Sequence, residues 1–186
     1  MKLSVSSRTD RKKSDIKKLR REGQVPAILY GPGKENKSLS FPLEQLQETL
    51  RKINPGRLAT TVFELEEGTG TVKALVKEVQ YHPVSYAILH VDFVQLEDDK
   101  LVKVNIPLRV SGQADCVGIK LGGFLRQVIR SMKVECLPKD LPEEIVVDVQ
   151  PLAIGESKKL EELPIPEKVR PLAHMKEIAV VITKRA

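Results

Sequence analysis

The chain has 186 residues, of which 41% are hydrophobic and 30% are charged, and its formal net charge is +6. This composition is enough for one or two globular domains with their own cores. No run approaches the roughly 18 apolar residues of a membrane span, and the basic start lacks the apolar run of a signal peptide, so neither membrane insertion nor secretion is predicted. We therefore expect a cytoplasmic protein without a membrane partner.

Positive charge is concentrated at the N-terminus. Nine of the first 21 residues are Lys or Arg and only two are Asp, which gives this segment a net charge of +7, whereas the remaining 165 residues together carry −1. A block of this density repels itself unless an anion lies against it, and nucleic acid is the commonest cytosolic polyanion. A solvated arm that only keeps the protein soluble is the alternative interpretation.

Periodicity favours an ordered basic surface. The segment from Ser14 to Gly23 has the pattern of a short helix, with Ser14 placed as its cap and Gly23 beyond its end. Ile16 and Leu19 share one helical face. The basic residues project from the opposite face or its flank: Lys17, Lys18, Arg20 and Arg21. Like charges four residues apart cost about 0.2–0.5 kcal/mol, a repulsion that bound phosphates would offset.

Strand patterns and one amphipathic helix fill the rest of the first half. Strands are predicted at 2–8, 25–30, 37–41, 59–65, 71–81 and 86–96. The helix spans 43–53, because four apolar residues share one of its faces, and an Asn-Pro-Gly sequence ends it. The expected fold is a compact sheet or small barrel with two short helices.

A polar break at 97–100 separates two domains, 1–96 and 97–186. The first carries a net charge of +5 and the second only +1, so we expect them to face different partners. Strands at 108–112, 131–138, 145–149 and 178–183 predict a mostly β second domain. Its near-neutral charge argues against a second large RNA footprint. Since it is a folded domain without visible chemistry, contact with a neighbouring protein or a role in assembly under stress is the hypothesis. Cys116 and Cys136 lack metal-site spacing and are predicted to be buried free thiols.

Polar side chains gather on the last two strands of the first domain. Strict alternation sends Val91 and Phe93 to one face and His90 and Asp92 to the other. The preceding strand and its end add four more polar residues: Lys73, Lys77, Gln80 and His82. A purely structural interpretation is that His90 and Asp92 satisfy each other at a sheet margin.

Two enzymatic alternatives deserve comparison. In the first, His82 and His90 act as general acid and base on RNA phosphodiesters, but no nucleophile or metal cluster completes such a site. In the second, Gly118 to Gly123 bind a nucleotide, but neither GxGxxG nor GxxxxGK[ST] is present, and a turn between strands explains these glycines better. No catalytic residue, metal, cofactor or small-molecule substrate is predicted.

The aromatic residues indicate the kind of nucleic acid. The chain has no Trp, three Tyr and four Phe, and most of them lie in apolar strand patterns, so a platform that stacks unpaired bases is not expected. Charged and amide side chains on a rigid sheet suit a folded, helical RNA. DNA is less favoured, because no helix-turn-helix or zinc module is visible.

A series of short motifs runs through nearly the whole chain. They are KKLR at 17–20, VPAILYG at 25–31, QYHP at 80–83, HVDF at 90–93, GIKLGG at 118–123, VECLP at 134–138, IVVDV at 145–149 and IGES at 154–157. In this order and spacing they resemble the bacterial 5S-rRNA-binding proteins that form the twenty-fifth protein of the large ribosomal subunit. The resemblance is to the long, two-domain form, the general stress protein form.

The resemblance implies a first domain related to the anticodon-binding barrels of some aminoacyl-tRNA synthetases. It also implies 5S rRNA, at its loop E region, as the ligand, neighbouring ribosomal proteins as further partners, and a monomer when free. The expected RNA-binding residues are Arg8, Lys13, Lys17, Lys18, Arg20, Arg21, Tyr30, Lys73, Lys77, Gln80, His82, His90 and Asp92.

The chemistry of these residues suggests their roles. Lys and Arg would neutralise phosphates, while Gln80, His82 and Asp92 would hydrogen-bond base edges or 2′-hydroxyls. For Tyr30, burial with an exposed hydroxyl is the alternative. The family often has an arginine pair where this chain has Lys17 and Lys18, so bidentate forks become point charges.

Overall fold

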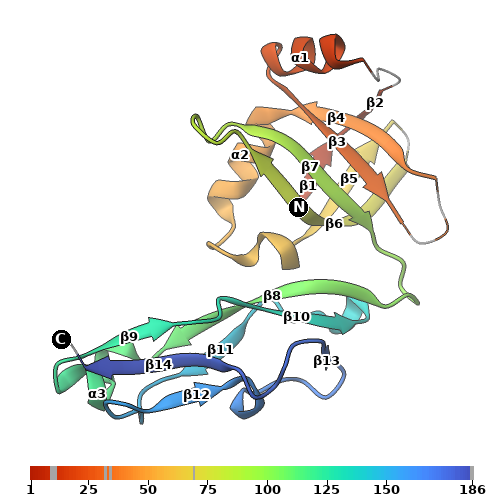
Figure 1. The fold of residues 1–186 in the computed structure, drawn as a ribbon. Coiled ribbons are helices and arrows are strands. Elements are labelled where there is room, and N and C mark those ends of the chain that lie inside the picture. The colour runs from red at the N-terminus through yellow and green to blue at the C-terminus, as the bar shows by residue number, and fades with distance from the viewer. Residues whose placement is uncertain (9–11, 32, 34, 69, 185–186) are drawn as a thin grey trace. The chain divides into compact units, whose positions relative to one another are not determined.

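The computed structural model describes residues 1–8, 12–31, 33, 35–68 and 70–184. The chain forms two compact units, Met1–Lys100 and Leu101–Ala186. Figure 1 shows that strands dominate both units.

Seven strands of the first unit form one sheet in the order β1-β5-β6-β7-β3-β4-β2. Their bounds are β1 Lys2–Ser4, β2 Ser6–Ser7, β3 Gln24–Tyr30, β4 Lys37–Pro42, β5 Val62–Glu67, β6 Gly70–Tyr81 and β7 Ile88–Gln95. The strands at the two edges, β1 and β2, are separated in sequence only by Val5, so the chain itself joins the two edges. The sheet therefore curves into a nearly closed barrel (Figure 1).

Three phenylalanines form the centre of the barrel core. The ring of Phe93 meets the rings of Phe41 and Phe63 edge-on, with ring centroids 6.0 Å apart in both pairs. All three side chains are fully buried. Such edge-to-face pairs add about 0.5–1.5 kcal/mol each beyond the burial of apolar area.

Helix α2, Leu43–Lys52, lies where the periodicity predicts it. It buries Leu46 against the core, and Leu43, Leu50 and Ile53 pack partly against the same cluster. The three leucines of the helix and Ile53, which directly follows its last residue, therefore pack against the same core, as the spacing indicates.

Helix α1, Lys13–Arg21, has Ile16 and Leu19 half-buried on one face. Gly23 follows the helix with φ 75°, the left-handed conformation that glycine adopts most easily. The prediction that Ser14 caps the helix is wrong. Ser14 lies inside the first turn, and its hydroxyl donates a hydrogen bond to the Asp15 carboxylate at 3.0 Å. Ser14 fails as a cap because it is already inside the helix, two residues after the cap position at Lys12 from which a side chain reaches the free N–H groups of the first turn.

Two predicted strands of the first unit differ from the structure by more than a residue or two at an end, and in the second unit the strand predicted at 108–112 begins already at Val102. The strand expected over 2–8 is divided at Val5 into β1 and β2. The strand expected from residue 59 begins only at Val62, because a 3-10 helix, η1 Arg57–Thr60, precedes it. Gly56, with φ 89°, leads into that helix.

The second unit contains two small sheets around one core. One has the order β11-β8-β10-β13 and the other β12-β14-β9. The bounds are β8 Val102–Ser111, β9 Gly123–Gln127, β10 Ser131–Cys136, β11 Ile145–Asp148, β12 Ser157–Lys159, β13 Arg170–Pro171 and β14 Ile178–Lys184. Ile106 of β8 and Ile182 of β14 are both fully buried in the same cluster, so the two sheets share their core. The predicted class, mainly β with a small barrel and a mostly β second domain, is confirmed.

The glycine-rich segment of the second unit is packed tightly. It forms the one-turn helix α3, Val117–Lys120, and the start of β9, so the described residues contain one α-helix more than the two predicted. A Cβ on Gly123 would lie 2.7 Å from the Gly118 carbonyl oxygen and 2.9 Å from Cγ2 of Ile182. The glycines therefore serve a close turn between elements, as predicted.

Both cysteines are buried free thiols, as predicted. The Cys116 thiol donates to the Leu152 carbonyl at 3.3 Å. Burial, with a smaller effect of the Asp140 charge, raises the pKa of Cys136, which keeps its thiol protonated.

Candidate nucleic-acid interface

Two bulges in the β6–β7 pair decide which side chains share its outer face. Glu78 pairs directly with Asp92, and Gln80 pairs with His90. The register shifts between Val76 and Glu78, so Lys77 is an extra residue in β6. Since paired residues of an antiparallel sheet point to the same side, the bulge turns Glu78 and Gln80 onto the face of His90 and Asp92.

Strict alternation could not find Glu78, because the bulge reverses the pattern after Val76. The only sequence signal is that Val79 is apolar, although alternation from Val76 would place it on the outer face. In the structure Val79 is half-buried. Glu78 therefore joins the candidate site only through the register of the sheet.

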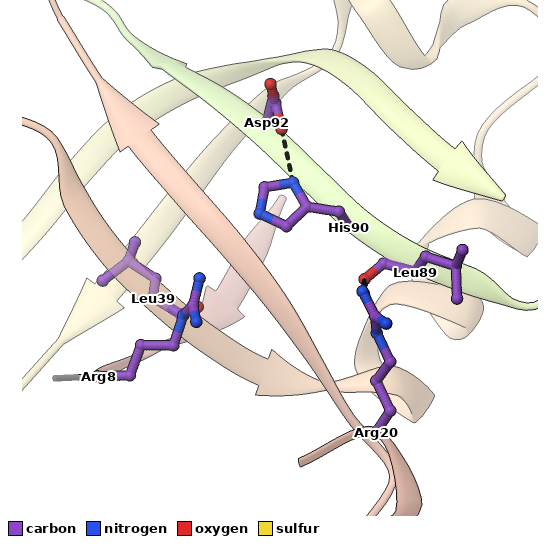
Figure 2. Close-up of polar contacts among 6 residues, drawn as sticks. All are labelled: Arg8, Arg20, Leu39, Leu89, His90 and Asp92. Atoms are coloured by element: carbon purple, nitrogen blue, oxygen red, sulfur yellow. Dashed lines mark hydrogen bonds and ion pairs between the residues drawn. The ribbon is translucent and has the colours of Figure 1, made fainter. Parts of the chain in front are cut away.

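His90 and Asp92 form the closest polar pair of this face. The distance from His90 Nδ1 to Asp92 Oδ1 is 2.7 Å, and the side chains are 16% and 28% exposed (Figure 2). A carboxylate accepts this hydrogen bond, so Nδ1 carries the proton and Nε2 is the ring nitrogen left for other contacts. The two side chains therefore satisfy each other, as the structural interpretation expects. This hydrogen bond orients the imidazole.

Tyr30 ends β3 beside these carboxylates. Residue Ile28 of β3 pairs with Asp92, so Tyr30, two residues on, lies on the same face of the sheet. Burial, together with the charges of Asp92 and then Glu78, raises the pKa of Tyr30. The phenol is therefore neutral and can donate a hydrogen bond.

Arg20 ties helix α1 to β7. Its Nη2 and Nε donate to the Leu89 carbonyl at 2.8 and 3.1 Å (Figure 2). Between Gln80 and Tyr81 the register shifts again, so that Leu89 is the extra residue in β7. A bulge leaves a backbone group without a partner in the hydrogen-bond ladder of the sheet. Here that group is the Leu89 carbonyl, and the Arg20 guanidinium donates to it. Arg20, predicted as an RNA contact, thus positions the basic helix.

The other cations of the basic segment point to solvent. Lys13, Lys17, Lys18 and Arg21 are exposed, and Lys18 approaches Glu22 only to 3.9 Å. Arg8 differs, because it is half-buried and its Nε donates to the Leu39 carbonyl at 3.0 Å (Figure 2).

His82 organises the turn between β6 and β7. Its Nδ1 accepts hydrogen bonds from the backbone N–H groups of Ser85 at 3.2 Å and Val84 at 3.4 Å. Its backbone N–H donates to the Ala87 carbonyl at 2.8 Å. The Nδ1 atoms of His82 and His90 therefore make different structural hydrogen bonds, one within the turn and the other with Asp92.

Lys73 lies apart from the other predicted residues, whereas Lys77 is the chain neighbour of Glu78. Lys73 pairs with Glu64 on the far half of β6, seven residues and roughly 23 Å of strand from Gln80. Lys77 is exposed at the bulge. The structure therefore brings together Tyr30, Glu78, Gln80, His90 and Asp92, with α1 attached through Arg20.

Most aromatic rings lie in strands, as expected, but the rings of Tyr81 and Tyr86 at the β6–β7 turn are exposed. Tyr81 is 49% exposed and Tyr86 is 77% exposed. Tyr86 also has φ 54°, a conformation that is unusual for a bulky residue and occurs often at functional turns. These rings extend the candidate site past His82, and the sequence carries no signal for the unusual backbone.

Neither a metal-binding cluster nor a membrane-spanning helix is found among the described residues. The described residues contain no group of three or more His, Cys, Asp or Glu that could hold a metal ion. Among the helices of that same part of the chain, none is both long enough and apolar enough to cross a membrane.

Comparisons with known proteins agree across the whole chain. Residues 3–93 match the Ribosomal L25p family, and residues 101–186 match the C-terminal domain of ribosomal protein TL5. The large ribosomal subunit proteins bL25 of Chlamydia muridarum and Chlamydia trachomatis serovar D are each 44% identical over 185 residues, which covers 100% of both chains. The bL25 protein of Chlamydia pneumoniae is 38% identical over the same length.

The fold and these relatives define a two-domain ribosomal protein of bacterial type, and not an enzyme. The chain belongs to the Ribosomal L25p family. Membership of a bacterial ribosomal family places it in the cytoplasm with the ribosome, as the sequence predicts.

Proposed function

We propose that this protein is a structural component of the large ribosomal subunit and that its first unit binds 5S rRNA in the loop E region. The relatives at 44% identity carry the name of a large-subunit protein, which supports the first part. The observation that carries the second is the attachment of α1 to β7 by Arg20, at 2.8 and 3.1 Å from the Leu89 carbonyl. It holds the exposed cations and the polar face of β6 and β7 in one geometry.

The two parts of this surface suit different parts of an RNA helix. Lys13, Lys17, Lys18 and Arg21 offer only hydrogen-bond donors and positive charge, which fit phosphates. Glu78 and Asp92 are acceptors that phosphates repel, so their partners are 2′-hydroxyls and base amino groups. Such groups line the wide, shallow minor groove of helical RNA.

The half-buried residues of the site fix the orientation of its hydrogen-bonding groups. The Asp92 carboxylate fixes the His90 ring, and the Tyr30 phenol stays neutral beside two carboxylates. A site that hydrogen-bonds particular groups loses affinity for an RNA that lacks them, because its polar atoms are then left unpaired. Loop E, whose pairing departs from the regular helix, would thus be distinguished from an ordinary duplex.

The test is binding of the full chain to a loop E fragment of 5S rRNA and to a fully Watson–Crick duplex of equal length, across a salt series. We expect tighter binding to loop E and intact RNA afterwards. Equal binding to both RNAs would reduce the protein to a general basic RNA binder. RNA cleavage that disappears when His82 and His90 are replaced would instead support the enzymatic alternative.

A further inference from the structure

The second unit contains a long segment without any acidic residue. Residues 97–186 carry a net charge of only +1, yet residues 116–134 alone carry +4. The four cations are Lys120, Arg126, Arg130 and Lys133, with no Asp or Glu between them. The near-neutral average therefore hides a strongly basic stretch, and such local charge determines what binds there.

This stretch includes β9, which lies at an edge of its sheet. From Phe124 to Arg130, exposed residues alternate with half-buried ones. The exposed set consists of Phe124, Arg126, Val128 and Arg130, which we call the β9 strip. Phe124 is 49% exposed and Val128 is 55% exposed.

The neighbouring strand adds no negative charge to this face. On β14, Thr183 pairs with Phe124 and Val181 pairs with Arg126. One strand further, Ser157 of β12 pairs with Val181. The Thr183 hydroxyl is buried, so this face of the sheet offers cations and apolar groups, and no carboxylate stands at the paired positions.

The arginines of the strip lack partners that other arginines of this unit have. Arg109 approaches Glu144 to 3.3 Å, and Arg170 approaches Glu135 to 3.9 Å. Within the part of the chain that the structure describes, the side chains of Arg126 and Arg130 make no ion pair and no hydrogen bond. Two unpaired guanidinium forks beside an exposed aromatic ring fit phosphates and a ribose or base.

We propose that the β9 strip is a second, smaller RNA contact of this protein. Arg126 and Arg130 bind phosphate oxygens, and Phe124 packs on a ribose or an unpaired base of a ribosomal RNA segment outside loop E. This inference goes beyond the proposed function, which concerns the first unit. An acidic protein surface is the competing occupant, and the experiment distinguishes the two.

The test compares the full chain with the double variant Arg126→Glu/Arg130→Glu on two probes: large ribosomal subunits depleted of this protein, and the loop E fragment. On subunits we expect affinity to fall at least about tenfold and the salt slope to shrink by roughly 1.4–1.8, because two phosphates are no longer neutralised. On the fragment we expect no change. Unchanged affinity for subunits would overturn the proposal, whereas failure of the unaltered protein to bind the fragment would count against the proposed function alone.

A control is Lys168→Glu/Lys176→Glu, which makes the same change of charge at exposed residues of the same unit outside the strip and also removes the ion pair of Lys168 with Asp140 at 3.2 Å. An equal fall in affinity in this control would overturn the proposal, since it would show a general charge effect. Thermal unfolding checks the fold, and Arg126→Gln/Arg130→Gln replaces the first variant if charge reversal unfolds the unit.

A second measurement identifies the class of partner. Phe124 is replaced by the photoreactive p-benzoylphenylalanine, and the protein is irradiated on the depleted subunits. We expect an adduct that ribonuclease removes. An adduct that resists ribonuclease and is removed only by protease would show a protein partner and overturn the proposal.

Discussion

The Arg20 guanidinium donates two hydrogen bonds to the carbonyl of Leu89, an extra residue in β7. The two residues are 69 positions apart in sequence, and their contact couples a short basic helix to the strand that carries His90 and Asp92. A helix of nine residues is marginal by itself in water, so this tertiary contact contributes to its order.

Arg20→Lys should loosen helix α1, because an ammonium cannot donate the same paired hydrogen bonds to one carbonyl. The contact is exposed, so we expect stability to fall by about 1 kcal/mol, together with faster amide exchange in α1 and weaker RNA binding. Arg21→Lys is the control, since Arg21 is exposed on the same helix. Equal exchange rates in both variants would contradict the positioning role of Arg20.

Lys17→Gln/Lys18→Gln should weaken binding to the loop E fragment and lower its salt slope by roughly 0.7–0.9 for each phosphate that is no longer neutralised. Stability should stay level or rise slightly, because like-charge repulsion on α1 falls. The matched control is Arg51→Gln/Lys52→Gln, two exposed cations at the end of α2. The prediction fails if both double variants change the salt slope alike.

Tyr30 should titrate above its ordinary pKa of 10.0, chiefly because of burial and then because of Asp92 and Glu78. The folded protein then holds this proton more tightly than the unfolded chain does. Stability from the neutral phenol is fully present below the unfolded pKa and is lost as the pH rises through the folded pKa. Wild type should therefore lose stability with rising pH in that range more steeply than Tyr30→Phe.

The measurement is a titration of tyrosine absorbance, with Tyr30→Phe identifying the contribution of Tyr30. Asp92→Asn and Glu78→Gln should each move that contribution to lower pH by removing a nearby negative charge. Glu64→Gln, on a different strand, is the control. If neither substitution changes the titration of Tyr30, the carboxylates do not act on the phenol.

His82→Ala should free the backbone N–H groups of Ser85 and Val84, whose hydrogen bonds the imidazole Nδ1 now accepts. We expect faster hydrogen exchange at these two amides with little change in overall stability. His82→Asn should restore protection, because an amide oxygen can accept the same bonds in a turn. If His82→Asn recovers the turn but not RNA affinity, the ring itself contacts RNA; if neither variant alters exchange, the turn does not depend on residue 82.

Gly123→Ala should destabilise the second unit by about 1–3 kcal/mol, the usual cost of overpacking. The added methyl would meet the Gly118 carbonyl oxygen at 2.7 Å and Ile182 at 2.9 Å. Gly70→Ala is the control, since the nearest atom there lies at an ordinary 3.7 Å. Thermal unfolding measures both, and equal melting temperatures would contradict the packing argument.

Local pattern was enough to predict most elements. The spacing of Leu43, Leu46, Leu50 and Ile53 predicts α2, since these residues share a helical face whatever lies around them. Alternation likewise indicates the burial of Val91 and Phe93. Capping was less predictable, because the helix begins at Lys13, one residue before the Ser14 that the pattern favours as its cap.

The candidate site could be predicted only in part. The sequence by itself determined that cations crowd one short helix and that His90 and Asp92 share a strand face, because charge and periodicity are local properties. Only the tertiary structure decided that Arg20 binds the Leu89 carbonyl and that Glu78 joins Asp92 and Tyr30. Bulges and strand neighbours set these contacts, and both depend on register between segments that are distant in the chain.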